Sequence, residues 1–147
     1  MEQTAPSAIA FPALLRHART TYGSAMRRAL VAVGCDDIPA NGLYVIGALA
    51  LGDYPIGRIV RDLRVSKQAA GQLVDTLVLR GYLERTVDAD DRRRLTLGLT
   101  ERGRMAAAAQ AMGRMGVDEE LAARVGADCV EQARKALETL IDMGAED

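Results

Sequence analysis

The hydrophobic period of this sequence changes directly after Gly81, from the spacing of a helix to that of a strand. Before this glycine, apolar residues recur every three or four positions, which is typical of helices that pack through one face. After it, positions 83, 85 and 87 alternate with 82, 84 and 86, and the leucines at 95, 97 and 99 alternate with their neighbours. The change of period predicts a helical region followed by two strands, which the polar segment 88–93 joins as a hairpin.

Four helices are expected before the hairpin. The apolar spacing places them over residues 8–33, 40–51, 55–62 and 67–80. Gly34 is the predicted stop of the first helix, and Pro55 suits the first turn of the third, where its missing N–H has no helical partner. Ser66 is the predicted N-cap of the fourth helix, and Gly81 is its predicted C-terminal stop.

Two further helices are expected after the hairpin. Thr100 is a candidate cap for a helix over 101–112, which Gly113 and Gly116 are predicted to break because glycine weakens a helix interior. The acidic run 118–120 is then predicted to begin the last helix, where negative charge stabilises the N-terminal end of the helix dipole.

The composition agrees with one soluble, mainly α domain over residues 1–147, with a small antiparallel β-hairpin. Apolar residues make up 49% and aromatic residues only 3%, which favours helices over a β-sandwich. No apolar run is long enough for a membrane span, and the N-terminus lacks the features of a signal peptide. We therefore expect a cytoplasmic protein with no membrane partner.

No group of residues has the spacing of a catalytic or metal site. Two cysteines, Cys35 and Cys129, and one histidine, His17, lie far apart, and no serine is paired with a histidine by motif. We therefore expect neither an enzyme nor a bound cofactor or metal. His17 is expected to be a solvated or interface side chain. Cys129 falls on the apolar stripe of the last helix and is expected in the core, whereas Cys35, directly after Gly34, is expected to be exposed.

The third helix, a short turn at Arg64-Val65 and the fourth helix, followed at once by a hairpin, have the order of a winged helix-turn-helix. The second helix of such a pair fits the major groove of DNA. Because its apolar stripe packs on the domain, we expect the opposite face of the helix over 67–80 to meet DNA. That face holds Lys67, Gln68, Ala69, Gly71, Gln72 and Asp75.

Positive charge is concentrated in the middle of the chain. Residues 54–103 carry ten basic and seven acidic side chains, whereas residues 104–147 carry five basic and nine acidic ones. This asymmetry suggests a polyanionic partner for the middle segment. The arginines at 92, 93 and 94 lie at the hairpin tip, where they can reach a minor groove or phosphates. Asp91 can hold the tip in one shape by accepting hydrogen bonds from an arginine or from the turn backbone.

Several of these segments resemble the MarR (multiple antibiotic resistance regulator) family of transcription factors. The resemblance extends from Leu43 to Gly103 and is most specific at the hairpin. Residues 91–100, D-R-R-R-L-T-L-G-L-T, match the wing signature D-x-R-x-x-x-V-x-L-T, with Leu97 where valine is usual. The other segments that carry the resemblance are 63–68, 73–77, 80–85 and 100–103.

The resemblance implies an obligate homodimer that binds a pseudo-palindromic operator in double-stranded DNA. Residues 8–35 and 101–143 would form the dimerisation helices, and residues 40–100 the winged helix-turn-helix. Many members are released by a small, often aromatic, ligand, which implies a ligand-responsive repressor here. The candidate ligand-binding residues are Tyr22, Met26, Tyr44 and Met105. More generally, the methionines at 26, 105, 112 and 115 are expected to pack in the core or in the dimer.

The resemblance also makes Arg93 the side chain that enters the minor groove, with its two arginine neighbours nearer phosphates. The predicted DNA-binding residues are Ser66, Lys67, Gln68, Ala69, Gln72, Asp91, Arg92, Arg93 and Arg94. Gln72 stands where many relatives carry arginine, which leaves the operator sequence open.

Two other functions stay open at this point. A thiol-based redox regulator of the same fold would use Cys35, although many oxidation-sensing relatives carry their cysteine near the start of the first helix, where residues 8–15 hold none. A winged helix can also serve as a protein-interaction module, but that role needs no cluster of arginines. The arginines therefore favour DNA as the partner.

Overall fold

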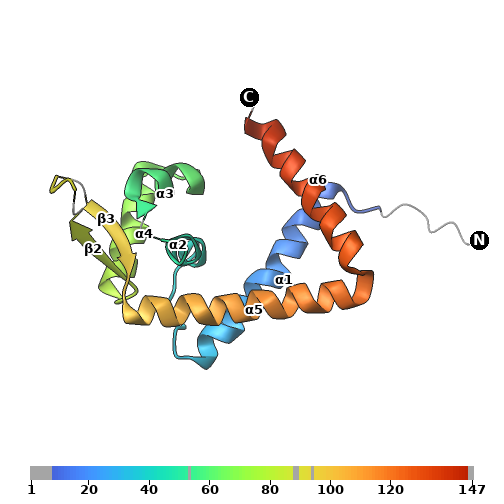
Figure 1. Ribbon diagram of the computed structural model, residues 1–147, viewed down its shortest axis with the longest axis horizontal. Coiled ribbons are helices and arrows are strands. Elements are labelled where there is room, and N and C mark those ends of the chain that lie inside the picture. The colour runs from blue at the N-terminus through green and yellow to red at the C-terminus, as the bar shows by residue number, and fades with distance from the viewer. Residues whose placement is uncertain (1–7, 53, 88–89, 94, 146–147) are drawn as a thin grey trace, which may run out of the picture.

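The computed structural model describes residues 8–52, 54–87, 90–93 and 95–145 (Figure 1). In chain order its elements are α1 (Phe11–Ala32), α2 (Gly42–Leu49), β1 (Tyr54–Pro55), α3 (Ile56–Leu63), α4 (Lys67–Leu79), β2 (Leu83–Val87), β3 (Leu95–Leu99), α5 (Glu101–Val125) and α6 (Ala127–Ala145). The long helix α5 joins two regions: α2, α3, α4 and the hairpin gather at one end, and α1 and α6 lie toward the other. The predicted mainly α fold with a hairpin wing is confirmed.

The helix before the hairpin, α4, has the N-cap and the C-terminal stop that the sequence predicts. The Ser66 Oγ accepts a hydrogen bond from the Ala69 N–H at 3.1 Å, which satisfies one of the free donors at the start of α4. Gly81 has φ +82°, and the N–H of Tyr82 returns to the carbonyl of Leu77 at 2.9 Å. This left-handed turn closes α4 and redirects the chain into β2.

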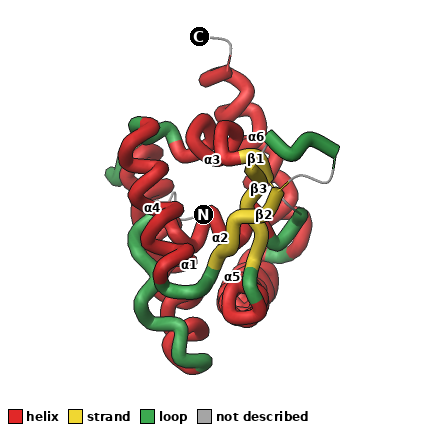
Figure 2. The backbone as a smooth tube through the Cα atoms, turned by 90° about the vertical axis from the view of Figure 1, so that its left-hand side faces the viewer, coloured by secondary structure: helices red, strands yellow, loops and turns green. Residues whose placement is uncertain are grey.

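The sheet contains the predicted hairpin and one additional short strand. β2 pairs antiparallel with β3, from Leu83 opposite Leu99 to Val87 opposite Leu95. β1 pairs with the other edge of β3, so the strand order is β1-β3-β2 (Figure 2). The sequence did not reveal β1, because a strand of two residues has no visible period and Pro55 is typical of a helix start.

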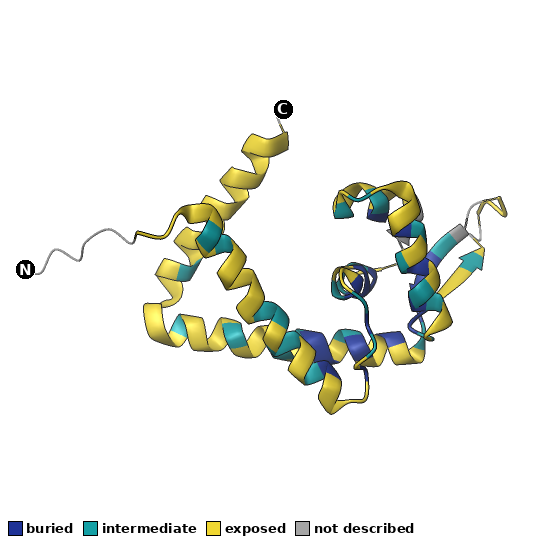
Figure 3. Ribbon diagram, turned by 180° about the vertical axis from the view of Figure 1, so that it is seen from behind, coloured by how far each residue is buried: buried dark blue, intermediate teal, exposed yellow. Residues whose placement is uncertain are grey.

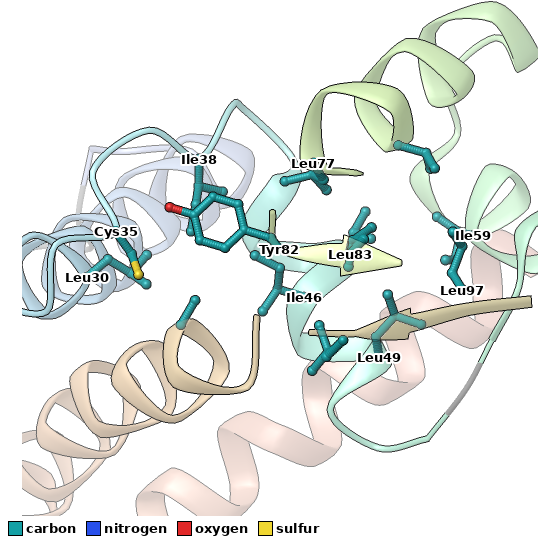
Figure 4. Close-up of a cluster of buried hydrophobic side chains, with 14 of the residues drawn as sticks. Leu30, Cys35, Ile38, Ile46, Leu49, Ile59, Leu77, Tyr82, Leu83 and Leu97 are labelled. Atoms are coloured by element: carbon teal, nitrogen blue, oxygen red, sulfur yellow. The ribbon is translucent and has the colours of Figure 1, made fainter. Parts of the chain in front are cut away.

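One apolar core joins the C-terminal end of α1 to the winged helix-turn-helix (Figures 3 and 4). Its largest fully buried side chains come from α1, α3, α4, the hairpin and α2: Leu30, Ile59, Leu77, Tyr82, Leu83, Leu97 and Ile46. Figure 3 shows that the buried residues gather on the inner sides of these elements, whereas α6 is exposed along its length. This core fixes which face of α4 points outward.

The prediction that Gly113 and Gly116 break the helix after the hairpin is wrong. α5 continues through both glycines to Val125. A Cβ at Gly113 would lie 2.7 Å from the carbonyl oxygen of Ala25 and 2.9 Å from the Cα of Met26, both in α1. Gly113 therefore allows α1 to cross α5 at close range, and this packing outweighs the cost of a glycine within a helix.

The acidic run 118–120 accordingly lies within α5, and not at the start of the last helix as predicted. Asp118 accepts a hydrogen bond from the hydroxyl of Tyr22, which links α5 to α1 beyond their crossing. This hydrogen bond raises the pKa of Tyr22, since only the neutral phenol donates to the carboxylate, and burial adds to the rise. The contact with α1 accounts for Asp118 better than the helix dipole does.

Both cysteine predictions are wrong. Cys35 is buried, with 1% of its surface exposed, whereas Cys129 on α6 is exposed. The N–H of Cys35 bonds to the carbonyl of Leu30 at 2.9 Å, which turns the chain back over the end of α1 after Gly34 and carries the side chain into the core. Cys129 stays exposed because α6 has no buried residue in the described chain, so its apolar stripe does not belong to this core.

The methionines do not form part of the core. Met26 is half-buried beside α5, whereas Met105, Met112 and Met115 are exposed on α5. The predicted packing of these methionines against a second copy stays untested.

Across the residues that the structure describes, no helix combines the length and the apolar character needed to cross a lipid bilayer.

Candidate nucleic-acid interface

The outward face of α4 is polar and open to solvent. Its exposed residues are Lys67, Gln68, Ala69, Gln72 and Asp75, with Gly71 half-buried among them. The opposite face is buried through Ala70, Val74 and Leu77. The orientation predicted for this helix is confirmed, so the side chains that can bond to base edges point away from the core.

The hairpin runs in the opposite direction to α4, so its tip lies toward the same end of the winged region as the helix start. Arg85 on β2 forms an ion pair with Asp75 on α4. Because α4 ends at Leu79 and β2 begins at Leu83, this pair shows that β2 runs back along the helix, as Figure 2 also shows. The outer end of the hairpin therefore lies on the same side as Ser66. An exposed pair of this kind contributes about 0–1 kcal/mol, so its main effect is on position.

The hairpin tip is exposed and is shaped by one carboxylate. Asp91, Arg92 and Arg93 are all exposed, and the Asp91 Oδ1 accepts a hydrogen bond from the backbone N–H of Arg93 at 3.0 Å. Of the two acceptor roles predicted for Asp91, this is the one with the turn backbone. Arg94 lies outside the described residues. The tip thus presents two described arginines toward the same end of the winged region as the start of α4.

A polar cluster that the sequence did not reveal holds the other end of α4. The Tyr82 hydroxyl donates to the carboxylate of Asp37, which lies between α1 and α2. The Arg102 guanidinium donates to the Asp37 Oδ1 at 3.1 Å and to the Tyr82 Oη at 2.8 Å, and it lies 4.5 Å from the centre of the tyrosine ring. Arg80 donates to the carbonyl oxygen of Asp37. The cluster therefore ties the α1–α2 loop to the end of α4 and the start of α5.

These contacts shift the pKa of both acidic members. The hydrogen bond from Tyr82, with the charge of Arg102, holds the pKa of Asp37 below its usual value. Burial, and then the bond to Asp37, raise the pKa of Tyr82 well above its usual value. No local pattern relates these residues, because they come from three separate segments. The only signal in the sequence is the polar side chains on both sides of Gly81.

The four residues predicted to line a ligand site do not converge within one chain. Tyr22 and Met26 lie on α1 beside the second half of α5, at Asp118 and Gly113. Met105 lies eight residues before Gly113, about 12 Å along the helix at 1.5 Å per residue. Tyr44 on α2 is exposed, and so is Met105. Two surface hollows of the protein have other linings, one including Leu49, Arg104 and Ala107 and the other including Pro12, Arg16 and His17.

The position of Cys35 offers little for the redox function considered for it, and no described histidine or cysteine belongs to a metal site. A reactive thiol must be accessible, and Cys35 is enclosed by the core. His17 is exposed, as expected. Among the described residues, histidine, cysteine and acidic side chains nowhere gather in a group that could hold a metal ion.

An outward-facing second helix with an antiparallel hairpin beside it defines the winged helix-turn-helix class of proteins. Residues 37–94, which contain α2, α3, α4 and much of the hairpin, match the sequence profile of the MarR family. This part of the chain is therefore similar to the winged helix-turn-helix of MarR family regulators. A search among curated proteins finds no match to the sequence.

Solved structures extend the likeness to nearly the whole chain. A mutant of MepR from a multidrug-resistant S. aureus clinical isolate is 19% identical, with a TM-score of 0.70 over 92% of this chain and 98% of that one. Wild-type MarR from E. coli in its apo form is 20% identical, with a TM-score of 0.65 over 91% and 98%. FabT of Streptococcus pneumoniae, in complex with DNA, is 17% identical, with a TM-score of 0.71 over 93% and 99%. These likenesses show that α1, α5 and α6 belong to the same fold as the winged region.

Proposed function

We propose that this chain is a homodimeric repressor that binds a pseudo-palindromic operator in double-stranded DNA and is released by a small aromatic ligand. The observation that carries the DNA part is the position of the exposed start of α4 and the arginine-bearing hairpin tip on one side of the winged region. A helix can then enter the major groove while the hairpin reaches the flanking minor groove. Such a regulator would work in the cytoplasm, where its DNA lies.

In this proposal the two parts of the interface have different tasks. Lys67, Gln68 and Gln72 discriminate between base pairs in the major groove, with Ser66 and Ala69 allowing the helix start to approach closely. Arg93 enters the minor groove, and its pattern of contacts depends on groove width more than on base identity. Asp91 shapes the turn that carries Arg93. The two neighbours of Arg93, Arg92 and Arg94, bind phosphates.

The proposed dimer rests on apolar surface that one chain leaves uncovered. The large exposed apolar side chains of α1, α5 and α6 include Phe11, Leu14, Met112, Met115, Leu121, Val125, Leu137, Leu140, Ile141 and Met143. A helix such as α6, without buried residues, is marginal in water unless something covers it. A second copy would cover it and would relate the two copies of α4 by a two-fold axis, about 34 Å apart on DNA. Residues 8–35 and 101–143 are then the dimerisation helices, and residues 40–100 the DNA-binding region.

Assembly is tested by truncation and by point variants. Truncation after Arg114 removes the second half of α5 and all of α6, and should give a monomer that does not bind specific DNA. The variant Leu137→Glu with Leu140→Glu should do the same without removing any chain, because both leucines are exposed in the protomer. Thr139→Glu, on the same helix but off the apolar stripe, is the control. If the double variant stays dimeric in light scattering, the proposed interface is wrong.

DNA binding is tested by gel shift with the DNA directly upstream of the gene and with a scrambled duplex, over a range of salt concentrations. Binding should prefer the upstream DNA and should weaken steeply with salt, by about 0.9 in log–log slope for each phosphate contact. Absence of binding to either duplex at low salt would favour the protein-interaction module instead.

The effector is tested by calorimetry with benzoate and 2-hydroxybenzoate. A ligand lowers DNA affinity only if it binds the free conformation better than the DNA-bound one. Since Tyr22, Met26, Tyr44 and Met105 do not meet in one chain, the proposed site needs the second copy to complete it. Tyr44→Ala and Met105→Ala should weaken both ligand binding and release from DNA. If neither compound binds or changes DNA affinity, aromatic carboxylates are excluded as effectors.

A further inference from the structure

The residue that ends α3 adopts a backbone conformation that rarely suits its type. Arg64 has φ 52° and ψ 37°, in the left-handed region, and its N–H bonds to the carbonyl of Arg61 at 3.2 Å. Among the described non-glycine residues, Asn41 shares a positive φ, at 65°. Asparagine tolerates this region well, whereas arginine does not, and glycine is the common residue at such a helix end. Glycine would form this turn with less strain. The backbone conformation therefore does not explain why an arginine stands at this position, and its side chain is expected to have a function.

Three basic side chains around the end of α3 form no ion pair in the described chain, although the exposed carboxylate of Asp62 lies between two of them in the sequence. Arg61, one turn before it on α3, and Lys67, the first residue of α4, are exposed like Arg64 itself. Within the described chain, none of these three side chains forms an ion pair or a hydrogen bond, whereas Arg85 is paired with Asp75.

This arrangement is unfavourable in the free protein. Three basic side chains so close in sequence repel one another, the single carboxylate of Asp62 offsets only part of this charge, and α4 has no acidic residue in its first turn to offset Lys67. An anionic partner placed against α3 and the turn would remove both costs. Because this surface adjoins the exposed start of α4, the anion that fits it is the backbone of the nucleic acid whose groove α4 would enter.

We propose that Arg64 is a phosphate-binding residue that positions the winged region on the DNA backbone, with Arg61 in the same row. The proposal rests on the DNA-binding function proposed above and adds a residue to that interface. In a helix-turn-helix the first helix crosses the DNA backbone, which brings its C-terminal end close to phosphates. A phosphate contact fixes register and adds affinity but carries no sequence information. Arg64 therefore sets how tightly every sequence is bound, while α4 sets which sequence is preferred.

The test is Arg64→Gly, because this variant separates stability from binding. Glycine relieves the left-handed turn, so the thermal midpoint should be unchanged or raised, while affinity for DNA should fall. Asn41→Gly is the matched control: it places glycine at the other described non-glycine residue with a positive φ, before α2, and should leave affinity unchanged. Arg64→Asn removes the charge but places a residue that tolerates positive φ. It therefore shows whether a loss of affinity in Arg64→Gly comes from the missing charge or from a more flexible turn. Arg64→Lys keeps the positive charge and should therefore retain most of the wild-type affinity.

The probes are a duplex of about 30 base pairs, three helical turns, that the wild-type protein selects from a random pool, and a scrambled duplex of the same composition. Arg64→Gly and Arg64→Asn should lower the affinity of the dimer about a hundredfold on both duplexes, which is about tenfold for each copy, the scale of one charged hydrogen bond. They should also reduce the slope of log affinity against log salt by about one for each copy.

The possible results separate this inference from the proposed function. If the wild-type protein selects no duplex, the DNA-binding function itself fails. If it selects one but Arg64→Gly and Arg64→Asn bind with wild-type affinity and salt slope, only the role of Arg64 is refuted. A loss confined to the selected duplex would mean that Arg64 reads bases, which also contradicts the phosphate assignment.

Discussion

Replacing Gly113 by alanine tests the crossing of α1 over α5, on which the position of the winged region relative to the terminal helices depends. The added Cβ would lie 2.7 Å from the Ala25 carbonyl oxygen, 3.0 Å from the Ala25 carbonyl carbon and 2.9 Å from the Met26 Cα. All three atoms belong to the α1 backbone, so no flexible side chain can move aside. The two helices would have to separate along their contact.

The size of the effect follows from two opposing contributions. Overpacking of a close contact costs about 1–3 kcal/mol, whereas alanine is favoured over glycine within a helix by about 0.5–1 kcal/mol. Because the clash is with backbone, we expect Gly113→Ala to lower the free energy of unfolding by about 1–2 kcal/mol. For a chain of this size that corresponds to a drop in thermal midpoint of about 2–8 °C.

Gly116→Ala is the matched control on the same helix. A Cβ at Gly116 meets no atom within 4 Å in the described protomer, so only the helix preference should remain and stability should rise by about 0.5–1 kcal/mol. Both variants are compared by circular dichroism during thermal and urea denaturation at one protein concentration, since the proposed dimerisation would make the midpoint depend on concentration. A Gly113→Ala protein as stable as the wild type would refute the close crossing.

Four further outcomes follow from the same structure. Arg93→Ala should weaken binding to the upstream duplex by about 1–3 kcal/mol with an unchanged circular dichroism spectrum, and Asp91→Ala should show a smaller loss; equal affinity in anisotropy titrations would remove the hairpin from the interface. Gln68→Ala should change the preferred bases in a set of single-base operator variants, and a uniform loss would contradict its role in base discrimination. Tyr82→Phe keeps the buried ring but removes the hydroxyl, and should lower the free energy of unfolding in urea by about 1 kcal/mol; no change would mean that the cluster does not stabilise the fold. Asp37 has a folded-state pKa below the ordinary 3.8, so the stability it contributes is complete above that value and is lost as the pH falls through the folded-state pKa. Asp37→Asn should therefore lose less stability than the wild type between pH 7 and pH 3, and parallel curves would contradict this.

The winged region could be predicted from the sequence because its signals are local. Ser66 caps the helix that follows it, Gly81 ends that helix, and the period of the apolar residues changes at the same glycine. Each of these signals acts within a few residues of its own position, so a single sequence contains the whole argument. The same holds for Asp91, whose acceptor role at the tip involves a residue two positions away.

The features that the sequence did not reveal depend on distant partners. In the sequence, Gly113 is typical of a helix break. It lies against the backbone of Ala25, and no pattern near position 113 predicts that contact. Asp37 and Arg102 lie 65 residues apart in the chain and meet only after α1 and α5 are placed. Cys129 lies on a helix whose apolar stripe faces away from the protomer core, so periodicity alone assigned it to the wrong environment.

The most direct test of a two-fold symmetric DNA-binding dimer is the selection of duplexes from a random-sequence pool by the full-length protein. The account predicts an enriched inverted repeat whose half-sites are centred about 10 base pairs apart, one helical turn, which is the spacing set by two copies of α4. In the same selection, Leu137→Glu with Leu140→Glu should lose the inverted repeat. Enrichment of a single unrepeated half-site, or of no sequence at all, would contradict the account.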